Sequence, residues 1–275
     1  MTRTRVHTNG IELSVRDEGS GPAVLLLHGF PDDHTVWDAQ VPALVAAGYR
    51  VIAPDTRGAG QSDMPAEEAA YRIEALVADL VGLLDALSIE QAAVVGHDWG
   101  AVQAWHLAMW HPARVSRLAA LSVGHPAAYA DGGWRQKLKG WYVLVFCLRG
   151  FAEWAIPLGD WRMFRRMRQN PAEAEATIAS YARPGRLTAG LNYYRANARR
   201  FMWQADRGHV AAPVLGLYSD GDRFLTAGQM QGSAAYVDGP FRYACIAGVA
   251  HWLQQEAPAA VNAELLSFLA EGQTA

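Results

Sequence analysis

Cysteine is scarce in this chain of 275 residues, because only Cys147 and Cys245 occur. Two cysteines cannot form a disulfide framework, and no further ligand stands near either one at the paired spacing of a metal site. We therefore expect two free, buried thiols in a reducing compartment, the cytoplasm, and we expect no metal.

Long apolar runs are also missing. The longest strongly apolar run, 141–148, has eight residues, whereas a helix needs about 20 to span a bilayer. The first ten residues contain two arginines but no apolar stretch, so no secretory signal is visible. We expect a cytoplasmic protein without a membrane partner.

Charge of one sign is not in excess either, since 24 lysines and arginines balance 27 aspartates and glutamates, for a formal net charge of −3. A chain with this balance lacks the basic footprint of a nucleic-acid-binding protein, so no nucleic-acid partner is expected. Disorder is excluded because 51% of the residues are hydrophobic and supply a large core. The length allows one or two domains.

Strands and helices alternate along much of the chain. The pair Asn9-Gly10 between two strand-like segments predicts a hairpin with a tight turn. Continuous apolar runs predict buried strands, and apolar residues at helical spacing predict helices between them. The strands are expected at 4–8, 11–16, 23–27, 49–54, 92–95, 115–123, 213–218 and 242–246, and the helices before 47 and at 71–87, 101–109 and 258–270. This alternation predicts an α/β fold with a mostly parallel central sheet and helices on both faces.

The alternation stops between residues 124 and 208, where no convincing strand appears. Half of the ten tryptophans and half of the ten tyrosines lie there. We interpret this part as an inserted helical cap, residues 125–208, over a core domain formed by 1–124 and 209–275. Large aromatic side chains line pockets for apolar small molecules, so a mostly dry cavity is expected beneath the cap. A solvated basic helix face is expected at Arg162, Arg165, Arg166 and Arg168.

The most informative segment is Gly96-His-Asp98-Trp-Gly100, which lies between a predicted strand and a predicted helix. The two glycines suit a sharp strand-to-helix turn that exposes the middle side chain at the edge of the sheet. A carboxylate that attacks a carbonyl gives an anhydride, whereas attack on a saturated carbon with a leaving group gives an alkyl ester. Asp98 therefore favours opening of a C–O or C–halogen bond. The competing interpretation is a helix-capping aspartate.

Hydrolysis of such an ester needs a base that activates water. His251 follows the last predicted strand, at the edge of the sheet where such sites form. An acid should orient it and stabilise its imidazolium. We favour Asp222, which lies further beyond the preceding strand than Asp220. Asp220 remains the alternative, and either residue suits an ordinary turn.

The turn His28-Gly-Phe30-Pro31 follows the most hydrophobic strand. Backbone N–H groups at this bend, at Phe30, and at Trp99 are expected to form an oxyanion hole for the second step, when water attacks the ester. For His28 we favour a hydrogen-bonded structural role.

Four segments together resemble the α/β-hydrolase superfamily and, within it, the epoxide hydrolases. They are His28-Gly-Phe-Pro31, Asp55-Thr-Arg-Gly-Ala-Gly-Gln-Ser62, Gly96-His-Asp-Trp-Gly100 and Gly248-Val-Ala-His-Trp252. The resemblance extends from about residue 10 to residue 269, and it implies the α/β-hydrolase fold. It implies Asp98 as nucleophile, His251 as water-activating base, Asp222 as its acid and a cis proline at Pro31. The implied substrate is a small apolar epoxide, with water as the second reactant.

Epoxide hydrolases also place two cap tyrosines over the nucleophile, where they protonate the leaving alkoxide. The resemblance maps one of them onto Tyr194, in Leu191-Asn-Tyr-Tyr-Arg195, and the other onto Tyr142. Neighbouring helical residues point about 100° apart, so Tyr193 and Tyr194 cannot both face the site, and Tyr193 remains the alternative. Packing within the cap is the competing interpretation for each tyrosine.

The remaining predictions concern the pocket, the partners and the rival functions. A substrate pocket is expected to be lined by Phe30, Pro31, Trp99, Tyr193 and Trp252. No phosphate-cradling glycine loop appears, so no cofactor is expected, and the protein should be a monomer or a homodimer. One alternative is a haloalkane dehalogenase with the same aspartate nucleophile, although dehalogenases commonly carry Asn where this chain has Phe30. The other is a non-catalytic, ligand-binding relative of the same fold.

Overall fold

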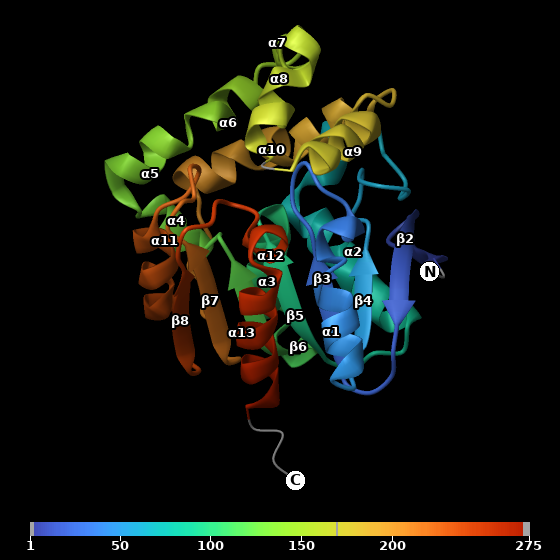
Figure 1. Ribbon diagram of the computed structural model, residues 1–275, viewed down its shortest axis with the longest axis vertical. Coiled ribbons are helices and arrows are strands. Elements are labelled where there is room, and N and C mark those ends of the chain that lie inside the picture. The colour runs from blue at the N-terminus through green and yellow to red at the C-terminus, as the bar shows by residue number, and fades with distance from the viewer. Residues whose placement is uncertain (1–2, 169, 272–275) are drawn as a thin grey trace.

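The computed structural model describes residues 3–168 and 170–271, with the backbone alone at residues 202 and 203. The described part contains one sheet of eight strands in the order β1-β2-β4-β3-β5-β6-β7-β8 (Figure 1). The strands are β1 (Arg3–Thr8), β2 (Ile11–Glu18), β3 (Ala23–Leu27), β4 (Arg50–Pro54), β5 (Ala92–His97), β6 (Val115–Leu121), β7 (Val214–Ser219) and β8 (Phe241–Ile246). The pairs β1–β2 and β2–β4 are antiparallel and the other neighbouring pairs are parallel, so the predicted mostly parallel sheet is confirmed.

Helices cover both faces of this sheet. They are η1 (His34–Trp37), α1 (Gln40–Ala46), η2 (Glu68–Tyr71), α2 (Ile73–Ala86), α3 (Trp99–Trp110), η3 (Pro112–Arg114), α11 (Ala227–Gln231), η4 (Gly232–Tyr236), α12 (Leu253–Glu256) and α13 (Pro258–Ala270), where η marks a 3₁₀-helix. Each predicted strand and helix is present, with ends within two residues of those expected.

The central strands have apolar side chains on both faces because both faces are covered. In β3, Leu25 and Leu27 join a core cluster that includes Leu76 of α2 and Trp105 of α3. The alternate residues of the same strand join a second cluster on the other face, together with side chains of α1 and α13. A strand buried on both sides therefore appears in the sequence as an uninterrupted apolar run.

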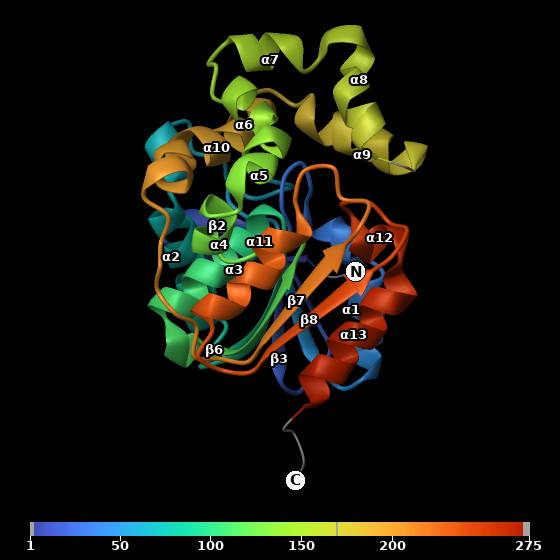
Figure 2. The same ribbon diagram turned by 90° about the vertical axis from the view of Figure 1, so that its left-hand side faces the viewer.

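Between β6 and β7 the described chain forms seven helices and no strand. They are α4 (Pro126–Ala130), α5 (Gly133–Lys139), α6 (Trp141–Phe146), α7 (Phe151–Ala155), α8 (Leu158–Met167), α9 (Pro171–Tyr181) and α10 (Arg186–Trp203). We call residues 125–208 the insertion segment. It lies over one end of the sheet, the end from which the chain passes into α3 (Figure 2).

Two further observations concern the predictions made from composition. The expectation that both cysteines are buried is wrong, because Cys147 is only partly buried and Cys245 is exposed. Cys245 lies on β8, which is an edge strand of the sheet in the described part of the chain. None of the described helices is long and apolar enough to cross a bilayer.

Candidate active site

Asp98 lies at a sharp turn between β5 and α3. Its φ of +53° is a left-handed conformation, which is strained for a residue with a side chain and is concentrated at functional sites. A Cβ on Gly100 would lie 2.0 Å from the carbonyl oxygen of Leu27, and one on Gly96 would lie 2.4 Å from the carbonyl oxygen of Gly100. The close approach of these backbone segments therefore requires both glycines of this strand-to-helix turn, which we call the elbow.

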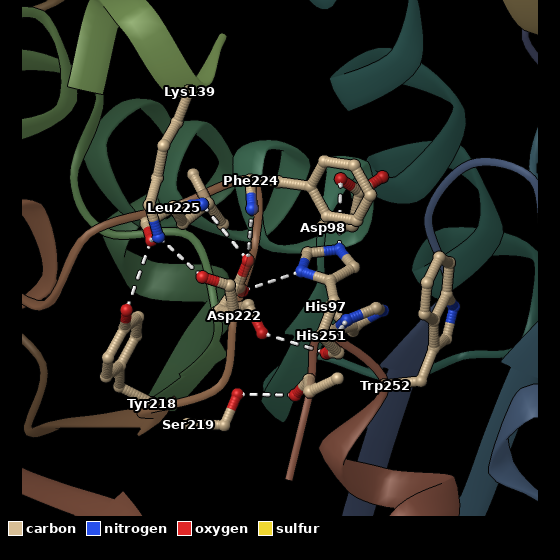
Figure 3. Close-up of polar contacts among 12 residues, drawn as sticks. His97, Asp98, Lys139, Tyr218, Ser219, Asp222, Phe224, Leu225, His251 and Trp252 are labelled. Atoms are coloured by element: carbon tan, nitrogen blue, oxygen red, sulfur yellow. Dashed lines mark hydrogen bonds and ion pairs between the residues drawn. The ribbon is translucent and has the colours of Figure 1, made fainter. Parts of the chain in front are cut away.

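His251 lies between two carboxylates (Figure 3). Its Nδ1 is 2.7 Å from Oδ2 of Asp222, and its Nε2 is 3.6 Å from Oδ2 of Asp98. Asp220 is exposed and accepts the backbone N–H of Gly248 instead. The structure therefore brings Asp222, and not Asp220, to the histidine.

The loop after β7 fixes the carboxylate of Asp222. Its Oδ1 accepts the backbone N–H groups of Phe224 at 2.7 Å and Leu225 at 3.0 Å, which leaves Oδ2 for the imidazole. The ammonium of Lys139, on α5, donates to the backbone carbonyls of Asp222 and Leu225 (Figure 3). This lysine, which the sequence analysis did not identify, links the insertion segment to the acid-bearing loop.

Two hydrogen bonds from buried side chains fix the backbone of the loop that carries His251. The backbone carbonyl of His251 accepts a hydrogen bond from Nε2–H of His97 at 3.0 Å and another from the hydroxyl of Ser122 at 3.2 Å. Burial lowers the pKa of His97 to about 3, so this ring is a neutral donor at neutral pH. Neither donor was predicted from the sequence, although the position of His97 beside Asp98 was an available signal.

Burial disfavours charge on all three central groups, but their opposite charges outweigh it. Burial lowers the pKa of His251, whereas the carboxylates of Asp222 and Asp98 raise it more strongly, to about 10. Burial raises the pKa of each carboxyl group, and the imidazolium of His251 brings both below their usual range. Asp98 is therefore ionised at neutral pH, which is the form that nucleophilic attack requires.

The turn after β3 faces Asp98 from the other side. The backbone N–H of Phe30 donates to Oδ1 of Asp98 at 2.8 Å, and the Phe30–Pro31 peptide bond is cis. A Cβ on Gly29 would lie 2.3 Å from the same carboxylate oxygen, so only glycine allows this approach. An amide donor is thus directed at the carboxylate, where an ester carbonyl would form.

A cavity of about 380 Å³ lies next to Asp98. Its other walls come from α3, the loop after β6, α4, α5, α6, α10 and the loop before α11. The described residues that line it are Asp98, Trp99, Val102, Val123, Gly124, Pro126, Tyr129, Ala130, Gln136, Lys137, Gly140, Trp141, Tyr142, Val143, Leu144, Tyr194, Ala198, Phe201 and Leu225. A mostly apolar wall with a few polar groups is suited to a neutral, apolar small molecule.

Two tyrosines of the insertion segment share this cavity with Asp98. They are Tyr142 of α6 and Tyr194 of α10, with ring centroids 6.3 Å apart. Burial raises the pKa of both hydroxyls well above the usual value, and the charge of Asp98 adds to this effect, so both carry a proton at neutral pH. Tyr193 does not line the cavity, and its hydroxyl donates to the backbone carbonyl of Arg57 at 2.6 Å.

The pocket residues expected from the sequence need correction. Of the five, the structure places only Trp99 in the wall of the 380 Å³ cavity, as far as the described residues show. Phe30 and Tyr193 line a neighbouring cavity of about 10 Å³, and Pro31 and Trp252 line neither. Proximity in sequence to Asp98 or His251 does not fix the direction of a side chain, which depends on packing against distant helices.

Trp252 and Arg168 belong to a buried link between the insertion segment and the sheet. The guanidinium of Arg168 pairs with the carboxylate of Asp32 and lies 4.2 Å from the ring centre of Trp252. The indole N–H of Trp252 donates to Asp32 as well, at 2.9 Å. The expectation of a solvated Arg168 is therefore wrong, because a carboxylate and a ring hold it in the interior.

Other polar groups near the site have structural partners. His28 accepts the backbone N–H of Thr56 at 2.9 Å, which agrees with its expected structural role. Asp33, His34 and Asp55 bring three groups that could bind a metal ion close together. However, the carboxylate of Asp55 already accepts hydrogen bonds from the ring N–H and the backbone N–H of His34, at 2.6 and 3.1 Å. These hydrogen bonds tie the loop after β4 to the loop after β3.

Comparisons with known proteins show which family the chain belongs to. A family model described as the alpha/beta hydrolase fold matches residues 22–146. The chain is 37% identical to epoxide hydrolase A of Mycobacterium tuberculosis, over 98% of this chain and 97% of that relative. It is 35% identical to an epoxide hydrolase of Caballeronia sordidicola, over 96% and 92% of the two chains.

Solved structures give the same result. The crystal structure of epoxide hydrolase A from Mycobacterium thermoresistibile superposes with a TM-score of 0.87 at 33% identity, covering 98% of each chain. Fold and sequence therefore agree on the class, which is that of the α/β hydrolases. Within this class, the chain belongs to the epoxide hydrolase family.

Proposed function

We propose that the protein hydrolyses an epoxide to a vicinal diol through a covalent ester on Asp98. The observation that carries the proposal is a cavity lined by an ionised carboxylate at a strained elbow and by two protonated tyrosines, with a histidine–carboxylate pair next to that carboxylate. The relatives from Mycobacterium tuberculosis and Caballeronia sordidicola, both named as epoxide hydrolases, support the proposal.

In the first step, a carboxylate oxygen of Asp98 attacks a ring carbon and the C–O bond of the epoxide breaks. The electron pair of that bond stays on oxygen, which takes a proton from Tyr142 or Tyr194. An alkoxide is a poor leaving group, so this proton stabilises the opening ring. The products of the step are an alkyl ester, a free hydroxyl and a tyrosinate.

In the second step, the ester has neutralised Asp98, and the imidazolium of His251 passes its proton to the tyrosinate. Its Nε2 then takes a proton from water, and the hydroxide attacks the carbonyl carbon of the ester. The N–H groups of Phe30 and Trp99 stabilise the oxyanion, while Asp222 stabilises the imidazolium. Collapse breaks the bond to the diol oxygen, which takes the second proton of the water, and restores the Asp98 carboxylate. The first proton of the water stays on His251, so the imidazolium of the resting enzyme is restored.

The tyrosines also favour an epoxide over a haloalkane. A halide leaves as a stable anion and needs N–H donors but no proton, whereas an alkoxide needs an acid. We propose in addition that residues 125–208 act as a cap domain on a core of 1–124 and 209–275, because α5, α6 and α10 supply the acid and most of the apolar wall.

The covalent step is tested by a single turnover in H₂¹⁸O, with enzyme in excess over styrene oxide. We expect diol without ¹⁸O and one labelled carboxylate oxygen on Asp98, because the attacking oxygen comes from the protein. Asp98→Ala should lose at least about 10⁴-fold in turnover. Labelled diol in the first turnover, or an active Asp98→Ala variant, would disprove the ester, and bromide release from bromoalkanes without diol formation would assign the site to a dehalogenase.

A further inference from the structure

The exposed large hydrophobic side chains of the described chain lie together in one part of the insertion segment, between residues 134 and 158. Their exposed fractions range from 48% to 70%. They are Trp134, Leu138, Trp141, Leu144, Leu148, Phe151, Trp154 and Leu158. Exposed apolar residues are ordinary when scattered, but a concentration of them marks an interaction surface.

These eight residues, which we call the apolar stripe, recur at every third or fourth position. That spacing places two of them on one side of each of α5, α6 and α7, while Leu148 lies between α6 and α7 and Leu158 begins α8. Figures 1 and 2 show these helices on the outer part of the insertion segment, with α7 and α8 at the end of the molecule farthest from the sheet. The stripe is therefore available to an external partner.

The segment that carries the stripe is rich in basic residues. Residues 133–168 contain eight lysines and arginines and two acidic residues, which leaves 16 basic and 25 acidic residues in the remaining 239. Arg135, Lys137, Arg162 and Arg166 are exposed. Arg149, Arg165 and Arg168 of the same segment pair with Glu68, Glu175 and Asp32, so its exposed positive charge comes mainly from those four exposed side chains.

We propose that the apolar stripe docks the protein on the surface of an anionic lipid bilayer. Tryptophan, leucine and phenylalanine enter the boundary between headgroups and acyl chains, and the flanking basic side chains bind lipid phosphates. A second copy of the chain fits less well, because a two-fold interface brings the same patch against itself and would oppose basic side chains. Docking of this kind needs no spanning helix, but it revises the expectation of no membrane partner.

The stripe and the cavity share two side chains. Trp141 and Leu144 line the wall of the cavity that contains Asp98, although their exposed fractions are 63% and 61%. A docked molecule therefore presents this wall to the bilayer. Where the proposed function holds, an apolar epoxide dissolved in lipid would reach Asp98 from that side.

Sedimentation with vesicles tests the docking without any substrate. The full-length protein should sediment with vesicles that contain phosphatidylglycerol and remain in the supernatant with phosphatidylcholine alone. Trp134→Ser combined with Trp154→Ser should weaken binding more than about tenfold. Arg135→Gln combined with Arg166→Gln should weaken it about 30-fold, whereas Arg3→Gln with Arg72→Gln, at exposed arginines outside the insertion segment, should leave it near the wild-type level.

Several results would overturn the proposal. They are equal sedimentation with both kinds of vesicle, no sedimentation with either, or a tryptophan variant that binds as the wild type does. A dimer in light scattering that dissociates in the tryptophan variant would assign the stripe to a second copy instead. The tryptophan variant should hydrolyse styrene oxide in buffer at the wild-type rate, so a loss of binding there is not a loss of folding or of the proposed activity.

Discussion

The two walls of the cavity are built differently, although they face the same carboxylate. The sheet side carries Asp98, which lines the cavity, and the pair His251 and Asp222 behind it, and hydrogen bonds fix all three. On the insertion side, Tyr142 and Tyr194 pack edge-on against neighbouring rings. The difference follows from burial, because charges removed from water need partners, whereas rings need only close contact.

This difference implies a division of roles in the proposed reaction. The sheet holds the groups whose charge changes during covalent chemistry, and the insertion segment supplies neutral proton donors and shape. Substitutions of the ionisable groups on the sheet side should therefore stop either ester formation or ester hydrolysis. Substitutions of the tyrosines on the insertion side should only slow ester formation.

The largest effect after the loss of Asp98 is expected from His251→Gln. This variant keeps the nucleophile but lacks the base for the second step, so the epoxide opens and the ester persists. Turnover should fall by about 10³-fold or more. Intact-protein mass spectrometry should show a gain equal to the mass of one substrate molecule.

A matched control identifies the site of the trapped ester. The double variant Asp98→Ala with His251→Gln should gain no mass from the same epoxide. A His251→Gln enzyme that turns over freely, or that never gains mass although it is folded, would contradict the assignment of the second step to this histidine.

A smaller effect is expected from the tyrosines. Tyr142→Phe and Tyr194→Phe each remove one proton donor and leave the ring, so ester formation should slow by about 10²-fold each. Tyr193→Phe is the matched control, because its hydroxyl is bound to the backbone carbonyl of Arg57 outside the cavity. It should retain the rate of ester formation within about threefold.

The rate is measured in single turnovers in the His251→Gln background, where ester formation is isolated from hydrolysis. If Tyr193→Phe slows this step as much as Tyr194→Phe does, the insertion wall acts through packing and not through proton donation. If Tyr142→Phe or Tyr194→Phe, with His251 present, slows ester hydrolysis as much as ester formation, the proposed division of roles is wrong.

The sheet and the elbow could be predicted because local constraints appear directly in the sequence. The run 23–27 is wholly apolar because helices cover both faces of β3, and Gly96 and Gly100 stand where a Cβ would meet backbone at 2.0 to 2.4 Å. For a similar reason, the candidates for the carboxylate partner of His251 could be limited to two residues that follow β7, of which the sequence favours Asp222. The loop geometry brings Asp222 to the histidine and directs Asp220 to the backbone N–H of Gly248.

The insertion wall could not be predicted to the same depth. The choice between Tyr193 and Tyr194 depends on how α10 is rotated against the sheet, which its own sequence does not determine. Arg168 was misjudged for a related reason, because its partner Asp32 lies 136 positions away. Contacts between distant segments decide both cases.

The smallest expected effect concerns the pKa of His251. Two carboxylates favour its protonated form and raise its pKa to about 10, so Asp98→Ala should lower that pKa by at least about one unit. NMR titration of protein labelled with ¹⁵N at histidine measures the change, and Asp220→Ala, which removes a carboxylate that does not contact the ring, should leave it unchanged. Formation of the ester neutralises Asp98 in the same way, so the imidazole loses its proton more readily when it must act as a base. An unchanged pKa in Asp98→Ala, or an equal fall in Asp220→Ala, would show that the sheet wall does not couple the charge of the nucleophile to the base.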